Sequence, residues 1–210
     1  MINLNVKFLT DDYIASVAES FLKQNSLTSI PVNIERVIES NYRMDIVPIP
    51  GMRDLLDTDG YCSPDCTAIY VDQYVYERIY NRYRFTLAHE LGHRVLHKRY
   101  FSELLFDSYS EWLTVMDQID SWDYSKMEYQ ANMFAGMTLV PTIFLKLEFN
   151  KQLCLFEPQL DHARSNGIGR DAYVPTLLDA IAHELSIKFE VSTDVLCRRI
   201  EFEHLQEEIP

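Results

Sequence analysis

The chain has 210 residues, a formal net charge of -13, and 47% hydrophobic and 24% charged residues. These values are typical of a globular protein with one large domain, or with a core and a small subdomain. They argue against a membrane protein, since no apolar run approaches the roughly 18 residues that a membrane span needs. The N-terminus also lacks the basic-then-apolar pattern of a signal peptide, so we expect a cytoplasmic protein.

The negative charge bears on the class of partner. Sequence-independent DNA binding needs a basic surface that displaces counterions, and an acidic chain does not supply one. The acidity suits attraction to a basic protein, or it serves only solubility. We therefore expect a protein partner, no direct contact with nucleic acid and no membrane contact; the oligomeric state is not readable from the sequence.

The first third of the chain predicts two helices and then two short strands. Apolar residues at helical spacing predict a helix over residues 11–25, and Pro31 is expected to open a second helix that runs to residue 39. Strands are predicted over 44–49 and 68–71, on either side of a turn-rich segment. If the strand at 68–71 lies at a sheet edge, its main chain could pair with an extended substrate; a purely structural strand is the alternative.

Four cysteines occur at Cys62, Cys66, Cys154 and Cys197. Only the first two are close in sequence, so neither a two-pair zinc framework nor a dense disulfide pattern is present. We interpret all four as free thiols, with a redox or metal-binding role for the close pair as the alternative.

The most specific pattern is His89-Glu90-x-x-His93. On a helix, residues four apart project from one face, so His89 and His93 can hold one zinc ion between them. Glu90 can then take a proton from a water molecule whose pKa the metal lowers toward about 7. Apolar residues recur at helical spacing around this motif, which predicts a partly buried face; they are Phe85, Ala88, Gly92, Val95 and Leu96.

Two neighbours of the motif carry expectations of their own. Gly92 costs about 1 kcal/mol relative to alanine within a helix, so we expect another element to pack closely against it. His97 continues the row of histidines, but three imidazoles spaced about 6 Å apart along one helix do not converge on one ion. We interpret His97 as a packing residue or as a partner of a ligand.

A third ligand must come from elsewhere in the chain. Glu128 and Asn132 are four apart on a second predicted helix, whose apolar stripe contains Ala131, Phe134, Ala135 and Leu139. Glu128 could complete the site and Asn132 could orient a ligand histidine. Alternatively, Glu128 caps or solvates the start of that helix, and spacing alone does not separate these two interpretations.

Together these motifs resemble the ImmA/IrrE family of metallopeptidases. The similarity rests on residues 84–97, on Glu-x-x-Ala-Asn-x-Phe-Ala from Glu128, and on Leu139-Val140-Pro141, and it extends to residues 30–32 and 182–199. It implies one zinc per chain, with manganese as an alternative metal. It implies His89, His93 and Glu128 as the zinc ligands and Glu90 as the catalytic base. It also implies helix-turn-helix transcriptional repressors as substrates, whose cleavage switches on mobile-element or stress-response genes.

The chain departs from the family pattern in the long interval 99–127. This segment contains Tyr100, Phe101, Leu104, Leu105, Phe106, Tyr109 and Trp112. Its aromatic residues could line a substrate groove or close the core over the site, and we favour the core for most of them because aromatic side chains bury large areas. We expect substrate selectivity to differ from relatives here.

After Pro141 the pattern predicts a short apolar helix, a polar loop over 165–169, and two helices that begin near Pro175 and Ser192. Arg198 and Arg199 form the only cationic pair of the last helix, which we interpret as a packing element.

We expect an α+β fold: a mostly helical metallopeptidase core with a small β-sheet beside the active-site helix. The expected domains are a core over residues 1–150 and a helical subdomain over 151–210 packed on it. The function predicted is zinc-dependent endopeptidase cleavage of a helix-turn-helix repressor. The alternative is a metal-stabilised binding protein, an anti-repressor or toxin–antitoxin component, that sequesters its partner without cutting it.

Overall fold

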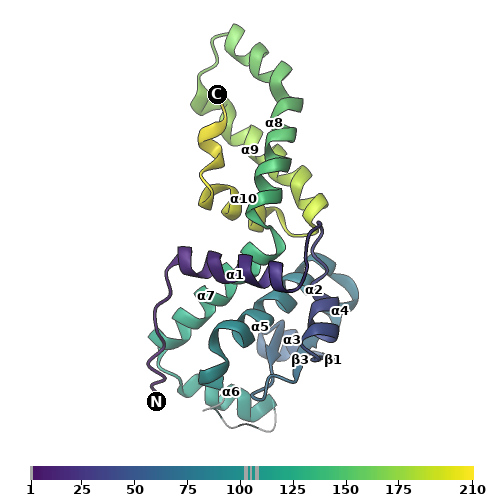
Figure 1. Cartoon of the computed structure of the whole chain (residues 1–210), viewed down its shortest axis with the longest axis vertical. Coiled ribbons are helices and arrows are strands. Elements are labelled where there is room, and N and C mark those ends of the chain that lie inside the picture. Colours follow the sequence, from purple (N-terminus) through teal and green to yellow (C-terminus); the bar gives the residue numbers. More distant parts are fainter. Residues whose placement is uncertain (1, 102–103, 105, 107–108) are drawn as a thin grey trace. The chain divides into compact units, whose positions relative to one another are not determined.

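The computed structural model describes residues 2–101, 104, 106 and 109–210, and the chain divides into two compact units (Figure 1). The N-terminal unit comprises Met1–Thr28 and Asn33–Thr138, and the C-terminal unit comprises Ser29–Val32 and Leu139–Pro210. The domain ranges 1–150 and 151–210 stay a prediction.

The expected α+β class is confirmed, because a small sheet accompanies a mostly helical chain. The helices of the N-terminal unit are α1 (Asp11–Gln24), α2 (Ile34–Arg36), the π-helix η1 (Val37–Asn41), α3 (Met52–Leu56), α4 (Gln73–Arg78), α5 (Tyr80–Phe101), α6 (Tyr109–Gln118) and α7 (Ser121–Leu139). Its strands are β1 (Asp45–Ile49), β2 (Gly60–Cys62) and β3 (Ala68–Asp72).

The second helix begins later than predicted. Pro31 follows a cis peptide bond and lies outside any helix. The helix starts at Ile34 instead, because the Asn33 side chain accepts a hydrogen bond from the main-chain N–H of Arg36 and so caps it. A proline alone is therefore a weaker start signal here than the asparagine two residues on.

The three strands are ordered β1-β3-β2, with β1 parallel and β2 antiparallel to β3. The strand predicted over 68–71 is thus the central one, and the prediction that its edge could accept a substrate strand is wrong. Its main chain pairs with a neighbour on both sides. Within the described sheet, β2 is the edge strand on the side of α5, which contacts both β2 and β3.

Two glycines allow helix α5 to lie close to its neighbours. A Cβ atom on Gly60 would lie 2.7 Å from Thr86 Cγ2 and 2.8 Å from the carbonyl oxygen of Tyr70, so β2 can approach α5 only with glycine there. A Cβ atom on Gly92 would lie 3.1 Å from Phe134 Cδ1, on α7. The close packing expected at Gly92 is confirmed, and it brings α5 and α7 together.

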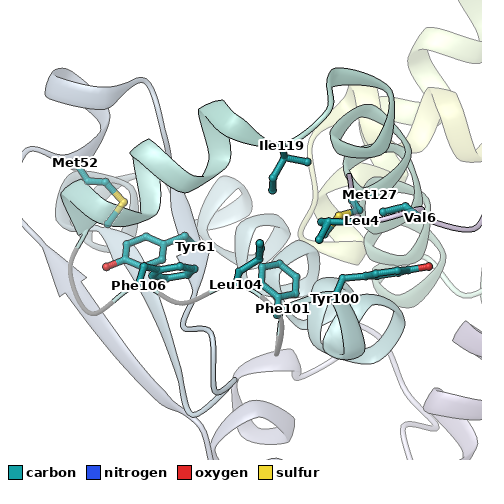
Figure 2. Close-up of a cluster of buried hydrophobic side chains, with 10 residues drawn as sticks. All are labelled: Leu4, Val6, Met52, Tyr61, Tyr100, Phe101, Leu104, Phe106, Ile119 and Met127. Carbon is teal, nitrogen blue, oxygen red and sulfur yellow. The ribbon is translucent and has the colours of Figure 1, made fainter. Parts of the chain in front are cut away.

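A hydrophobic cluster at the far end of α5 closes this part of the core (Figure 2). It gathers side chains from the N-terminal segment, α3, β2, the end of α5, the segments on either side of α6, and α7: Leu4, Val6, Met52, Tyr61, Tyr100, Phe101, Leu104, Phe106, Ile119 and Met127. Tyr100, Phe101 and Phe106 of the segment 99–127 are therefore buried in the core, as predicted for most of its aromatic residues. Leu105 lies outside the described residues.

The C-terminal unit consists of α8 (Thr142–Ser165), α9 (Arg170–Phe189), α10 (Thr193–Phe202) and the 3-10 turn η2 (Leu205–Glu208). Two predictions were wrong here: the helix after Pro141 is long, and α9 begins at Arg170 with Pro175 inside it. Pro175 lies in the second turn, where its missing N–H leaves only one carbonyl without a helical donor. Ser192 caps α10 as predicted, since its side chain accepts from the N–H of Val195.

The last helix is a packing element of this unit. Arg199 is buried, and it donates hydrogen bonds to the Val140 carbonyl and to the Glu203 carboxylate. Across the described parts of the chain, every helix is too short or too polar to cross a membrane.

Candidate metal centre

Helices α5 and α7 bring three potential ligands together. His89 and His93 are one turn apart on α5, and their Nε2 atoms are 3.0 Å apart. Glu128 reaches them from the middle of α7, with Oε2 3.3 Å from His89 Nε2 and Oε1 3.4 Å from His93 Nε2. Because Glu128 lies in the third turn of its helix, the alternative that it caps the helix start is wrong.

The spacing of these donor atoms fits a tetrahedral zinc ion. With metal–ligand distances of about 2.0–2.2 Å, neighbouring donors around such an ion lie about 3.3 Å apart. The two Nε2 atoms are 3.0 Å apart, and each of them lies close to that value, at 3.3 or 3.4 Å, from a different oxygen of the Glu128 carboxylate. Two imidazole nitrogens and one carboxylate oxygen are also the donor set of hydrolytic zinc sites, which leave a fourth position for water. The group could thus hold a metal ion.

Each histidine is held through its other ring nitrogen. His89 Nδ1 lies 3.1 Å from the amide oxygen of Asn132, which confirms the expected orienting contact. His93 Nδ1 lies 3.1 Å from His97 Nδ1, and His97 Nε2 lies 2.9 Å from Gln130 Oε1. His97 is fully buried, and burial lowers its pKa to about 3, so this ring is neutral. His97 is therefore a partner of a ligand, as interpreted from the sequence.

Without a metal, proton binding at the site is strongly shifted. Burial opposes a charge on His89, but the hydrogen bond from its ring to Glu128 and the nearby carboxylates outweigh burial and raise its pKa to about 9. Burial likewise opposes charge on Glu128, yet the hydrogen bond that it accepts from His89 holds the pKa of its carboxyl well below the ordinary range. A binding metal must therefore displace a proton from His89.

Glu90 follows the first ligand and is itself buried against β2. Burial raises its pKa, although the neighbouring His89 and His93 oppose that shift. The main-chain N–H of Cys62 donates a hydrogen bond to its carboxylate. A buried carboxylate with a raised pKa, fixed by a main-chain donor beside two metal ligands, is suited to accept and return a proton.

These groups open onto one cavity of about 290 Å³. Its polar wall contains His89, Glu90, His93 and Glu128, and its other walls come from the β2 strand with the preceding loop, from α6 and from α7. A cavity of this size beside a candidate metal site could admit part of a peptide chain.

Comparison with known proteins identifies the family. The model of a peptidase family, described as the IrrE N-terminal-like domain, matches residues 80–201, which is more than half of the chain and contains all four site residues. The chain belongs to the IrrE N-terminal-like family.

Two further comparisons were made with this IrrE-like chain. Its fold aligns with a Mycobacterium tuberculosis transcriptional regulator at a TM-score of 0.49 and 16% sequence identity, covering 92% of this chain and 47% of that chain. This chain thus spans about half the length of that regulator. The search of curated proteins gave no significant match.

One residue of the site was missed by sequence reasoning. Tyr124 lies one turn before Glu128 on α7, lines the cavity, and its hydroxyl donates a hydrogen bond to the Glu128 carboxylate. Burial and the two neighbouring glutamates raise its pKa, so the hydroxyl keeps its proton. The four-residue spacing to Glu128 was the available signal, but it became meaningful only once Glu128 was placed in the site.

The segment 99–127 of this IrrE-like chain also reaches the site. Phe101 packs edge-on against the His93 ring, with ring centroids 5.5 Å apart. Trp112 stacks on Tyr61 at 5.0 Å, and it lines the cavity together with Phe101 and Met116. Both interpretations of the aromatic residues therefore hold, and Phe101 belongs both to the core cluster and to the cavity wall. The side chain of Tyr109 lies outside the described part of the structure.

All four cysteines of this IrrE-like chain are free, as predicted. Cys62 lines the cavity, and its thiol is hydrogen-bonded to that of Cys66. That bond, with help from Arg94, lowers the pKa of Cys66 to about 7 and raises that of Cys62. No described third Cys, His or acidic ligand joins the pair to form a second metal cluster.

Proposed function

We propose that this protein is a zinc-dependent endopeptidase. The observation that carries the proposal is the convergence of His89, His93 and Glu128, whose ligand atoms lie within 4.8 Å of one another beside the buried carboxylate of Glu90. Membership of the IrrE N-terminal-like peptidase family supports it.

The chain's own residues supply proton transfer and positioning. Bound zinc would polarise the scissile carbonyl and lower the pKa of an attacking water toward about 7. Glu90 accepts the proton of that water on its carboxylate and later gives it to the leaving amine nitrogen. The burial that raises the Glu90 pKa helps the carboxyl hold the proton between these two steps. Tyr124 keeps Glu128 oriented through its hydroxyl.

We propose that an extended stretch of substrate lies along β2. This strand is the described edge of the sheet beside α5, and Gly60, Tyr61 and Cys62 all line the cavity. An added strand there would gain main-chain hydrogen bonds at any sequence. Side chains from segment 99–127, such as Trp112, would then contribute selectivity.

We propose a helix-turn-helix repressor as the substrate. The proposal follows from the family resemblance, and the net charge of -13 suits a basic DNA-binding protein. Its cleavage would derepress mobile-element or stress genes.

The test compares the zinc-loaded wild type with Glu90→Gln on purified helix-turn-helix repressors, and reads new chain termini by mass spectrometry. Defined fragments from the wild type, and none from the variant, support the proposal. If both proteins form complexes with the repressor and neither yields fragments, the proposal fails, and the result supports the alternative of a metal-stabilised binding protein.

A further inference from the structure

We propose that His97 and Gln130 are positioning residues that fix the tautomer of His93, so that its Nε2 lone pair is available to a metal. The inference rests on the proposed metal site and adds two residues that set the proton position of one of its histidines. The carrying observation is a continuous chain of hydrogen bonds, buried from His93 through His97 to Gln130, that ends at the main-chain carbonyl of Lys7.

The direction of every bond follows from the last acceptor. The Lys7 carbonyl oxygen can only accept, so the group 3.0 Å from it is the amide NH₂ of Gln130. The carbonyl oxygen of that amide therefore faces His97 Nε2 at 2.9 Å and accepts its N–H. The orientation of this amide is thus set by its surroundings.

The same logic continues to the ligand. A neutral His97 that carries its proton on Nε2 has a lone pair on Nδ1, which accepts the N–H of His93 Nδ1 at 3.1 Å. His93 then has no proton on Nε2, the atom that faces His89 and Glu128. If His97 carried its proton on Nδ1, His93 would have to protonate Nε2 and could not ligate a metal through it.

Burial makes this arrangement specific. His93, His97 and Gln130 are 4%, 0% and 1% exposed, so water does not compete for their hydrogen bonds. His89 differs, because its orienting partner Asn132 is exposed. His93 thus depends on its protein partners more than His89 does.

The far end of the chain of bonds is anchored by the N-terminal segment. The N–H of Lys7 donates to the Tyr100 hydroxyl at 2.9 Å, and the N–H groups of Leu4 and Val6 donate to the buried Asp123 carboxylate at 3.0 Å each. The Lys7 carbonyl is therefore held in place, and the N-terminal segment is coupled to the metal site through it.

The test measures zinc dissociation constants of the full-length chain by competition with a chromophoric chelator. His97→Leu removes the acceptor of the His93 N–H, and Gln130→Met removes the acceptor that sets the His97 tautomer. Each should weaken zinc binding about 10- to 100-fold, as for other partners of metal-ligating histidines. His97→Gln, whose amide can both accept and donate, should recover most of the affinity.

Thr138→Val is the matched control, since Thr138 is another fully buried polar residue of α7 and its hydroxyl has no hydrogen-bond partner among the described residues. It should bind zinc as the wild type does. Equal zinc affinity in His97→Leu, Gln130→Met and the wild type would overturn the proposal, and circular dichroism excludes unfolding as the cause of a loss.

Nitrogen NMR of the imidazoles in the metal-free wild type provides a readout that does not need zinc. We expect the His93 proton on Nδ1, and a proton only on Nε2 would overturn the proposal. If the wild type binds no zinc, the proposed function fails, and the NMR result still decides the tautomer.

Discussion

At the scale of single residues, Glu90 is the proposed base of the chemical step. Glu90→Gln keeps the size of the side chain but removes the proton acceptor, so we predict that cleavage falls by about 10²- to 10⁴-fold. Zinc content should stay near that of the wild type, because Glu90 is not among the three grouped ligands. Turnover is measured on a cleaved repressor, with elemental analysis of the same sample. Cleavage at the wild-type rate would remove Glu90 from the role of base.

The coupling of His89 to Glu128 predicts how the stability of the metal-free protein depends on pH. Because the folded pKa of His89 is about 9 against an ordinary 6.5, its charge stabilises the fold fully below pH 6.5, and this contribution is lost as pH rises through 9. The Glu128 contribution has the opposite sign: it is present above the ordinary value of 4.5 and is lost as pH falls below that.

Urea unfolding of chelator-treated protein tests this dependence. The free energy of unfolding should fall by on the order of 2 kcal/mol between pH 6.5 and 9. Glu128→Gln should flatten the profile, because an amide does not favour the charged imidazole. A wild-type stability that is constant over this interval would contradict the assigned pairing.

Residue spacing predicted His89, Glu90 and His93, because a helix fixes which side chains share a face. The family resemblance added Glu128, which spacing alone left open. Gln130 and the main-chain N–H of Cys62 were not predictable, since their contacts depend on how α7 and β2 pack against α5. Their residue types carry no signal on their own.

At the scale of elements, the approach of β2 to α5 positions the Cys62 N–H on Glu90. Gly60→Ala would place a methyl group 2.7 Å from Thr86 Cγ2 and 2.8 Å from the Tyr70 carbonyl, so the strand or the helix must shift. We predict a loss of about 1–3 kcal/mol in the free energy of unfolding, together with reduced cleavage. Denaturant titration measures the free energy of unfolding.

Gly169→Ala is the control for that substitution, because nothing lies within 4 Å of a Cβ atom there. Its cost should stay below that of Gly60→Ala and reflect only the poorer N-cap that alanine provides for α9, by less than about 1 kcal/mol. Equal stability of Gly60→Ala and Gly169→Ala would show that the contact between β2 and α5 is looser than the structure has it.

The element types were largely predictable, while several starts and neighbours were not. Helical periodicity identified α1, α5 and α7. It did not identify Asn33 as the cap of α2 or the start of α9 before Pro175. A proline inside a helix removes one main-chain hydrogen bond without having to mark the helix start. Strand order depends on contacts distant in sequence, so the central position of β3 could not be deduced from its residues.

At the scale of the whole molecule, the net charge of -13 predicts electrostatic attraction to a basic substrate. We predict that kcat/KM on a basic repressor falls several-fold as sodium chloride increases from about 50 to 500 mM, because salt screens charges beyond about one Debye length. An uncharged peptide that contains the same cleavage site serves as the control and should show little change. Equal salt dependence for both substrates would assign the acidity to solubility alone.

The central claim is that His89, His93 and Glu128 hold one metal ion. The most direct measurement is metal per chain, by elemental mass spectrometry, on the wild type and Glu128→Ala prepared side by side. We predict about one zinc per wild-type chain and much less in the variant, since removal of one of three protein ligands leaves an incomplete site. A wild type that is metal-free and does not take up added zinc would contradict the account.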